Sequence, residues 1–195
     1  MATTISGTSG VTFPAGGVGN PAGAVVGTTD TQTLTNKTIQ GGAITSGTAV
    51  ASTSGTSIDF TSISSWVKRI TVMFNGVSTS GTSVVQIQIG STTFSTSGYT
   101  SGSQVTTQTT ATSGFIVENT GSGAAANTLI GAMTLSLFGS NTWVANGVMF
   151  LNSSNNAFNS GISSALAGAL DRVRITTVNG TDTFDAGSIN ILYEG

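Results

Sequence analysis

Beyond residue 57, apolar and polar side chains alternate along the chain with a period of two. In "SWVKRITVMFNGVST" (residues 65–79) most of the apolar residues share one parity, and the dipeptide Asn75-Gly76 predicts a turn at the end of a strand. In "SVVQIQIGS" valine and isoleucine alternate with Gln86 and Gln88. This second segment predicts a half-buried strand with both glutamines on the solvent face.

Two longer alternating regions follow. "TLIGAMTLSLFGSNTWVANGVMFLN" predicts two strands joined by a hairpin at "GSN", and the first strand directs inward Leu129, Met133, Leu135 and Leu137. "RVRITTVNGTDTFDAGSINILYEG" alternates again and predicts a turn at Asn179-Gly180. Only "GISSALAGALD" has a helical spacing, which Gly168 weakens. About eight strands with Gly and Asn turns predict an all-β fold, a jelly-roll-like β-sandwich head.

Residues 1–50 lack this pattern. Both prolines, Pro14 and Pro21, lie in "VTFPAGGVGNPAGAVVG", and the chain that follows is rich in Thr, Ser and Gly with widely spaced hydrophobic residues. Such a segment cannot bury enough of itself to fold alone. We therefore expect an extended N-terminal arm over residues 1–50 that partner proteins order, and a head domain over 51–195; a disordered tail is the alternative. The residues expected to anchor the arm in an assembly are Val25, Val26, Leu34, Ile39 and Ile44.

The composition narrows the range of partners. Charged residues make up 6% of the 195 residues and the net charge is −2, while Gly, Ser and Thr are abundant. A surface with so few charges lacks the repulsion that keeps proteins apart, which suits a component of an assembly. No basic cluster is present, so we expect no nucleic-acid partner. Since no run of about 18 apolar residues occurs and "MATTISGTSG" does not resemble a secretory signal, we also expect cytoplasmic synthesis and no membrane span.

Residues for catalysis are scarce. The chain has no cysteine and no histidine, so thiolate ligands and the commonest acid–base side chain are absent. Ser65 and Lys68 match the S-x-x-K spacing of serine acylases, but on a strand the two side chains point to opposite faces. Residues 17–22 match a nucleotide-binding loop, but Pro21 and the lack of a following helix remove its mechanism. We expect no enzymatic activity, no metal and no cofactor.

The carboxylates that lie close together in sequence are Asp171, Asp182 and Asp185. They could bind Ca²⁺ or form the acid pair of a glycosidase. Arg172 and Arg174 project from the solvent face of the same predicted strand. Two arginines beside three carboxylates favour structural salt bridges over either of those sites.

Three aromatic residues allow more than one interpretation. Tyr99 and Trp143 could stack on host glycans if they are exposed, but a buried core position is the favoured interpretation for both. Trp66 lies on an apolar strand face, so we expect it in the core.

Three segments resemble proteins of tailed bacteriophages. "TDTQTLTNKTI" (residues 29–39) resembles a short linker element near the N-terminal ends of tail-fibre and other virion proteins. Residues 55–83 and 170–194 are similar to a compact module at the C-terminal end of many such proteins, whereas residues 92–166 differ from it. The resemblance implies a virion location and trimeric fibres with entwined arms. It implies no catalytic residues.

We therefore expect a non-enzymatic virion protein on the particle surface, a homotrimer made in the cytoplasm of the host bacterium. It would be a capsid-decorating (cement) protein or a short head fibre bound to the major capsid protein, or to a tail or collar protein. The alternative is a short tail fibre, a receptor-binding protein that contacts host surface glycans. Two further classes are a glycan-cleaving tailspike, which needs a positioned pair of acids, and a bacterial adhesin or carbohydrate-binding module, which normally carries an export signal.

Overall fold

The structure, a computed structural model, describes residues 5–6, 10–11, 44–119, 125, 127–151 and 155–195. The chain divides into two compact units, Met1–Gln40 and Gly41–Gly195. In the first unit, strand β1 (Ile5–Ser6) pairs antiparallel with β2 (Gly10–Val11). Four expected anchors of the arm lie outside the described residues: Val25, Val26, Leu34 and Ile39.

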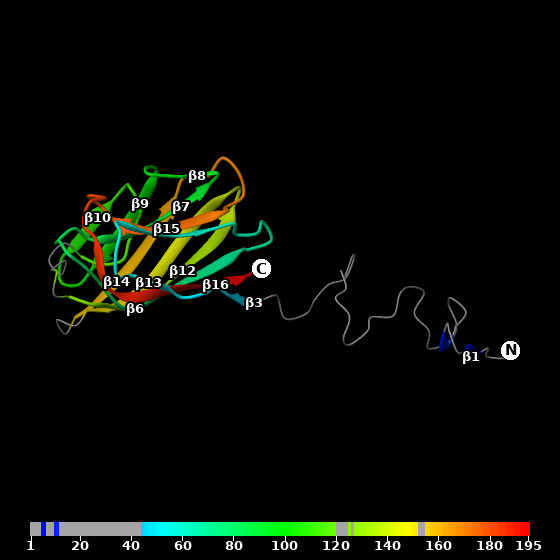
Figure 1. Ribbon diagram of the computed structural model, residues 1–195. Helices are drawn as coiled ribbons and strands as arrows, with labels where there is room; N and C mark the ends of the chain where they lie inside the picture. The colour runs from blue at the N-terminus through cyan, green and yellow to red at the C-terminus, as the bar shows by residue number, and fades with distance from the viewer. Residues whose placement is uncertain (1–4, 7–9, 12–43, 120–124, 126, 152–154) are drawn as a thin grey trace. The chain divides into compact units, whose positions relative to one another are not determined.

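The described part of the second unit is built from two antiparallel sheets (Figure 1). The large sheet has nine strands, in the order β10 (Gln108–Ala111), β9 (Tyr99–Gln104), β14 (Asn155–Ser163), β13 (Thr142–Leu151), β12 (Leu129–Gly139), β6 (Arg69–Thr79), β16 (Phe184–Glu194) and β3 (Ile44–Ser46), with β4 (Val50–Ala51) also paired to β16. The small sheet has the order β11 (Phe115–Ile116), β7 (Val85–Ser91), β15 (Arg172–Thr177) and β5 (Ser57–Thr61), with β8 (Thr93–Phe94) paired to β7.

One hydrophobic core lies between the sheets. The inward side chains of the large sheet, among them Val72 and Met133, join those of the small sheet, among them Ile87 and Val173, in a single buried cluster. Full burial of such a side chain contributes about 1.5–3 kcal/mol. The predicted all-β sandwich is confirmed, and the described residues contain no helix. The jelly-roll connectivity stays a prediction.

Two of the three predicted turns are present, the hairpin between β12 and β13 and the turn between β15 and β16. Ser140 and Asn141 have φ angles of 47° and 60° between β12 and β13, as a two-residue hairpin turn requires. The side chains expected to point inward from β12 do so: Leu129, Met133 and Leu135 are buried, and Leu137 packs against the core. Gly180 has a φ of 69° in the turn between β15 and β16.

The predicted turn at Asn75-Gly76 is wrong, because β6 continues through it to Thr79. The strand has paired neighbours on both sides, β12 and β16, and their registers with β6 shift here. Gly76 has a φ of 65°. The glycine therefore makes a bulge that bends the strand without ending it.

The predicted helical spacing over residues 161–171 does not give a helix. Its first residues, including Gly161 and Ile162, are the end of β14, where they pair with β9 and β13. Residues 164–171 form a connection without regular structure. The helical prediction is therefore wrong, because sheet pairing on both sides of β14 outweighs the weak helical spacing.

Residues 44–50, which the sequence assigns to the arm, lie along β16 in the structure, where β3 and β4 pair with it. Ile44 lies opposite Glu194, Val50 lies opposite Ile189, and the Gly47 N–H donates to the Ile191 carbonyl at 2.7 Å. Without this pairing the backbone groups on that side of β16 would be unpaired, a liability for any edge strand.

Candidate functional site: the outer face of the large sheet

Large apolar side chains cover the outer face of the large sheet where β12, β13 and β14 lie together. These side chains face away from the core, and each is at least 41% exposed: Ile130, Val148, Phe150, Phe158 and Ile162. We call these five residues the apolar face. Phe158 is the most exposed of them, at 61%.

The register of the strands places four residues of the apolar face side by side, whereas Ile162 lies across a row of polar side chains from them. Phe158 on β14 lies opposite Val148 on β13, and Phe150 lies opposite Ile130 on β12. A row of small polar side chains crosses the same three strands, because Asn146 pairs with both Ser160 and Thr134. The surface thus has hydrogen-bonding groups next to apolar ones.

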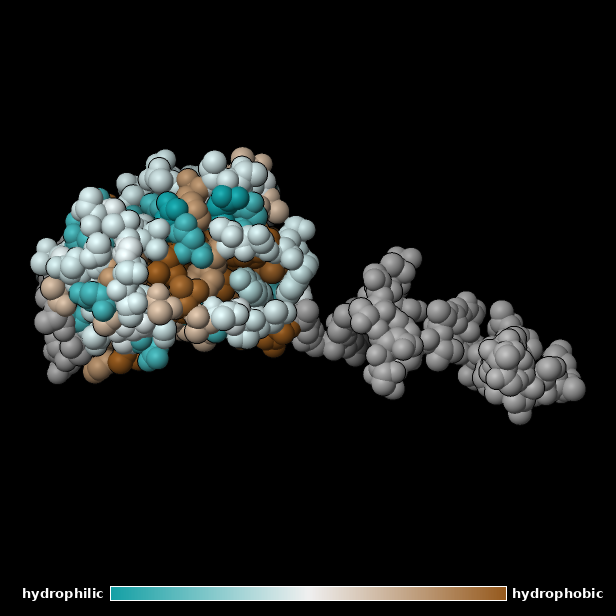
Figure 2. All heavy atoms as spheres, viewed as in Figure 1, coloured by the Kyte–Doolittle hydropathy of each residue, from teal (hydrophilic) through white to brown (hydrophobic). Residues whose placement is uncertain are grey.

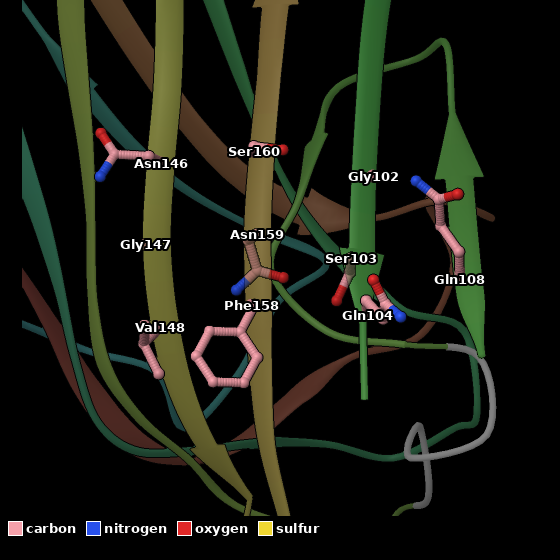
Figure 3. Close-up of a pocket in the computed structure, with 10 residues that line it drawn as sticks. All are labelled: Gly102, Ser103, Gln104, Gln108, Asn146, Gly147, Val148, Phe158, Asn159 and Ser160. Atoms are coloured by element: carbon pink, nitrogen blue, oxygen red, sulfur yellow. The ribbon is translucent and has the colours of Figure 1, made fainter. Parts of the chain in front are cut away.

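A depression of about 370 Å³ opens beside this row (Figure 3). Val148 and Phe158 line one part of it, and the amide side chains of Asn146, Gln104 and Gln108 are among the other groups that line it. A Cβ added at Gly102 would come within 2.9 Å of the Gln108 Nε2 atom. The glycine therefore leaves room for the glutamine amide at the rim.

The strands β9, β10, β12, β13 and β14 contain no charged residue. The charge pair that the large sheet does carry lies on β6 and β16, where Arg69 and Glu194 are 2.5 Å apart. In Figure 2 most of the described surface is pale, the colour of residues near neutral hydropathy, and strongly hydrophilic residues form separate teal patches. The apolar face therefore has no charged neighbour on its own strands.

The sequence contains a signal for the apolar face that the alternating pattern does not reveal. The run Val148–Leu151 is apolar at four consecutive positions, and Leu129 is followed directly by Ile130. Strands covered on both faces are typically continuous apolar runs, whereas strands with one wet face alternate. On β14 the small residue Ala157 points inward and Phe158 points outward, which periodicity does not reveal.

The outer face of the small sheet carries the charges instead. Arg174 donates to both carboxylate oxygens of Asp59, at 2.8 and 2.7 Å, because β5 and β15 pair with these residues opposite each other. Arg172 donates to both oxygens of Asp171, at 2.7 and 3.1 Å, and these bonds hold the pKa of Asp171 below its ordinary value. The two guanidinium carbons lie 5.5 Å (Arg172) and 4.1 Å (Arg174) from the ring centre of Phe94.

The predicted salt bridges are thus present for Asp171 with Arg172 but wrong for the other two carboxylates. Asp182 accepts from the Ser83 N–H at 2.9 Å and from the Asn179 side chain at 2.7 Å, so it stabilises a turn. Asp185 accepts from the Ser78 hydroxyl. No group of three metal-ligating side chains occurs among the described residues.

Tyr99 and Trp143 lie in the core, at 2% and 1% exposure. The Tyr99 hydroxyl accepts from the Ile89 N–H at 2.9 Å and donates to the Ser95 carbonyl at 3.1 Å. Burial raises the pKa of Tyr99 to about 12. Because strand parity turns both rings inward, the core position favoured by the sequence is confirmed for both residues. Neither ring can stack on a sugar, so the alternative of a glycan contact is wrong.

Three other side chains depart from their predicted positions. Gln86 and Gln88, expected in solvent, are buried because the chain around Ser113 crosses them: the Ser113 hydroxyl donates to Gln86 at 2.8 Å, and Gln88 donates to the Ser113 carbonyl at 2.9 Å. Trp66, expected in the core, is 40% exposed, because it lies in a turn before β6 begins.

Glu118 is a buried carboxylate that the sequence did not single out. It is 4% exposed, follows β11 and accepts from the Val85 N–H at 2.8 Å. Burial raises its pKa from 4.5 to about 7. It lines a small cavity with the buried side chains of Val77 and Leu129.

Comparison with known proteins finds no matching family model, no matching curated protein and no matching solved structure. Within the described ranges, no helix has the length and apolar character to cross a membrane. The bacteriophage resemblance stays a prediction from the sequence.

Proposed function

We propose that this chain is a non-enzymatic structural protein of a tailed-bacteriophage virion. It assembles as a homotrimer and is displayed on the particle surface as a capsid-decorating protein or short head fibre. It is made in the cytoplasm of the host bacterium and binds the major capsid protein, or a tail or collar protein, of the same virion.

The uncharged apolar face of the large sheet is the observation that carries this proposal. Contiguous apolar patches of several hundred Å² on a protein surface mark interaction sites. Here large side chains such as Phe158 and Phe150 stand in solvent on strands without a charge. Covering a half-exposed side chain of this size contributes on the order of 1 kcal/mol, so the face favours a chain that works inside an assembly.

Immunolabelling of intact particles of the virus that encodes this chain tests the proposal. An antibody against residues 51–195 is expected to label the whole head, as a decorating protein requires. Label at a single vertex would favour the tail-fibre alternative. Purified particles without label would overturn a virion role.

A second candidate is a short tail fibre that contacts host surface glycans. The depression beside Phe158 favours it, because an exposed ring can stack on a sugar while the amides of Gln104, Gln108 and Asn146 can bond to sugar hydroxyls. Titration of the chain with purified host surface polysaccharide separates the two candidates. Binding that is lost in a Gln108→Ala variant would favour the tail fibre, and no binding would favour decoration.

A further inference from the structure

We infer that the apolar face of the large sheet is the surface through which copies of this chain pack against one another. The inference rests on the homotrimer of the proposed function and assigns its subunit contact to particular residues. The centre of the contact is formed by Phe158, Val148, Phe150 and Ile130.

The distribution of charge favours a second copy as the occupant. Close to a threefold axis, each residue meets its own copies in the neighbouring chains, so a charge near the axis meets charges of its own sign. The strands that carry the apolar face have none, whereas the arginines of the described chain are in ion pairs elsewhere. A partner of different sequence could supply opposite charges and would not require this neutrality.

The size of the face is in the range of a subunit contact. The five adjacent strands from β10 to β12 contain no charged residue and are spaced about 4.8 Å apart, and the three longest of them, with nine to eleven residues each, span about 30 Å or more. The flat area is therefore roughly 20 by 30 Å, or about 600 Å². A stable protein–protein interface buries about 800 Å² on each partner, and pleated side chains add to the flat area.

The arrangement of residues on the face also matches the anatomy of an interface. Four apolar side chains lie together toward one end of the strands, and the adjoining row of Asn146, Ser160 and Thr134 offers donors and acceptors to a neighbouring copy. Phe158 projects beside a depression of about 370 Å³. A side chain projecting from one copy can fill the depression of the next, which is how aromatic anchors dominate interfaces.

The apolar run Val148–Leu151 in the sequence also indicates that the outer face of β13 is covered. Met149 and Leu151 are buried in the core, and Val148 and Phe150 are exposed on the other face of the same strand. A strand with apolar residues on both faces is expected where both faces are covered.

Sedimentation velocity of the full-length chain at micromolar concentration tests the inference. The test variant is Phe150→Asp/Phe158→Asp. The control is Val178→Asp, since Val178 is 44% exposed in the connection that follows β15 of the small sheet. We expect trimers for the wild type and the control and at least a tenfold weaker association for the test variant.

The outcomes separate the inference from the proposed function. A test variant that stays trimeric overturns this interface but leaves the homotrimer, held by another surface, in place. A monomeric wild type overturns both. If the double variant fails to fold by circular dichroism, Phe158→Ser gives the same readout with a smaller change, and a trimer of unchanged affinity there would also count against the interface.

Disulfide cross-linking gives an independent readout, because the chain has no cysteine of its own. With a copper–phenanthroline oxidant, full-length Val148→Cys is expected to form covalent pairs of chains, and Val178→Cys is expected to form none. Cross-linking of Val178→Cys alone would place the contact near the connection that follows β15 and overturn the inference.

Discussion

The outer faces of the two sheets differ in how they carry charge. On the small sheet, Arg172 and Arg174 are fixed by Asp171 and Asp59, and both guanidinium groups lie against the ring of Phe94. On the large sheet, the strands around Phe158 hold no charge, and the apolar side chains are open. Because the chain has so few charges, the position of each one is informative. The charged outer face of the small sheet is suited to solvent, whereas the uncharged outer face of the large sheet is suited to a partner.

Introducing a charge on the apolar face of the large sheet should have the largest effect on association between copies. We expect Val148→Lys and Val148→Asp each to weaken association at least tenfold alone, because like charges meet between copies. A mixture of the two variants should associate again, since opposite charges then meet. Sedimentation measures both effects, with the same pair of substitutions at Val178 as the control. Failure of the mixture to recover would mean that each variant disrupts the face for another reason.

The buried carboxyl group of Glu118 should have little effect on association between copies but a clear effect on the free energy of unfolding. The pKa of Glu118 is about 7 in the folded chain and 4.5 when exposed, so the folded state keeps a proton that the unfolded state releases. Its contribution is fully present below pH 4.5 and is lost as the pH rises through about 7, by up to about 3 kcal/mol. Glu118→Gln cannot lose a proton. Urea unfolding at a series of pH values should therefore show the variant gaining stability over the wild type between these limits; a constant difference would contradict this account.

Removing a charge from the outer face of the small sheet should have a smaller effect on the free energy of unfolding. Arg174→Ala loses a bidentate bond to Asp59 and the contact with Phe94, which together contribute about 1 kcal/mol at a partly exposed site. Urea unfolding should show this loss, while sedimentation should show unchanged association. Weaker association of the variant would indicate that the outer face of the small sheet takes part in the subunit contact.

Salt should have the smallest effect and should separate the two faces. Raising NaCl from low to physiological concentration screens the Arg174–Asp59 pair and should lower stability by a few tenths of a kcal/mol. The association constant should stay the same or rise slightly, because the apolar face has no charge to screen. A steep fall in association with salt would indicate a charged interface.

The fold was largely predictable from the sequence, because period-two alternation and Gly or Asn turns are local signals. The alternation in β12 and β15 and the turns after Leu137 and Val178 are where they were expected. Local signals cannot report contacts between distant segments. The pairing of Arg174 with Asp59 joins residues 115 positions apart, and the burial of Gln86 depends on chain that crosses it later.

The candidate site was missed for a related reason. Alternation is normally used to assign apolar residues to the core, and Phe158 beside Ala157 reverses that assignment. The unbroken apolar run in β13 and the adjacent pair Leu129 and Ile130 on β12 are the signals of two covered faces. The sequence therefore predicts which strands exist better than which of their faces meets a partner.

Hydroxyl-radical footprinting of the assembled full-length chain tests the central claim most directly. Phe158, 61% exposed in a single copy, should be protected in the wild type and oxidised in the Phe150→Asp variant, whose copies separate. Oxidation of Phe158 in the wild-type assembly at the same rate as in separated copies would contradict the account.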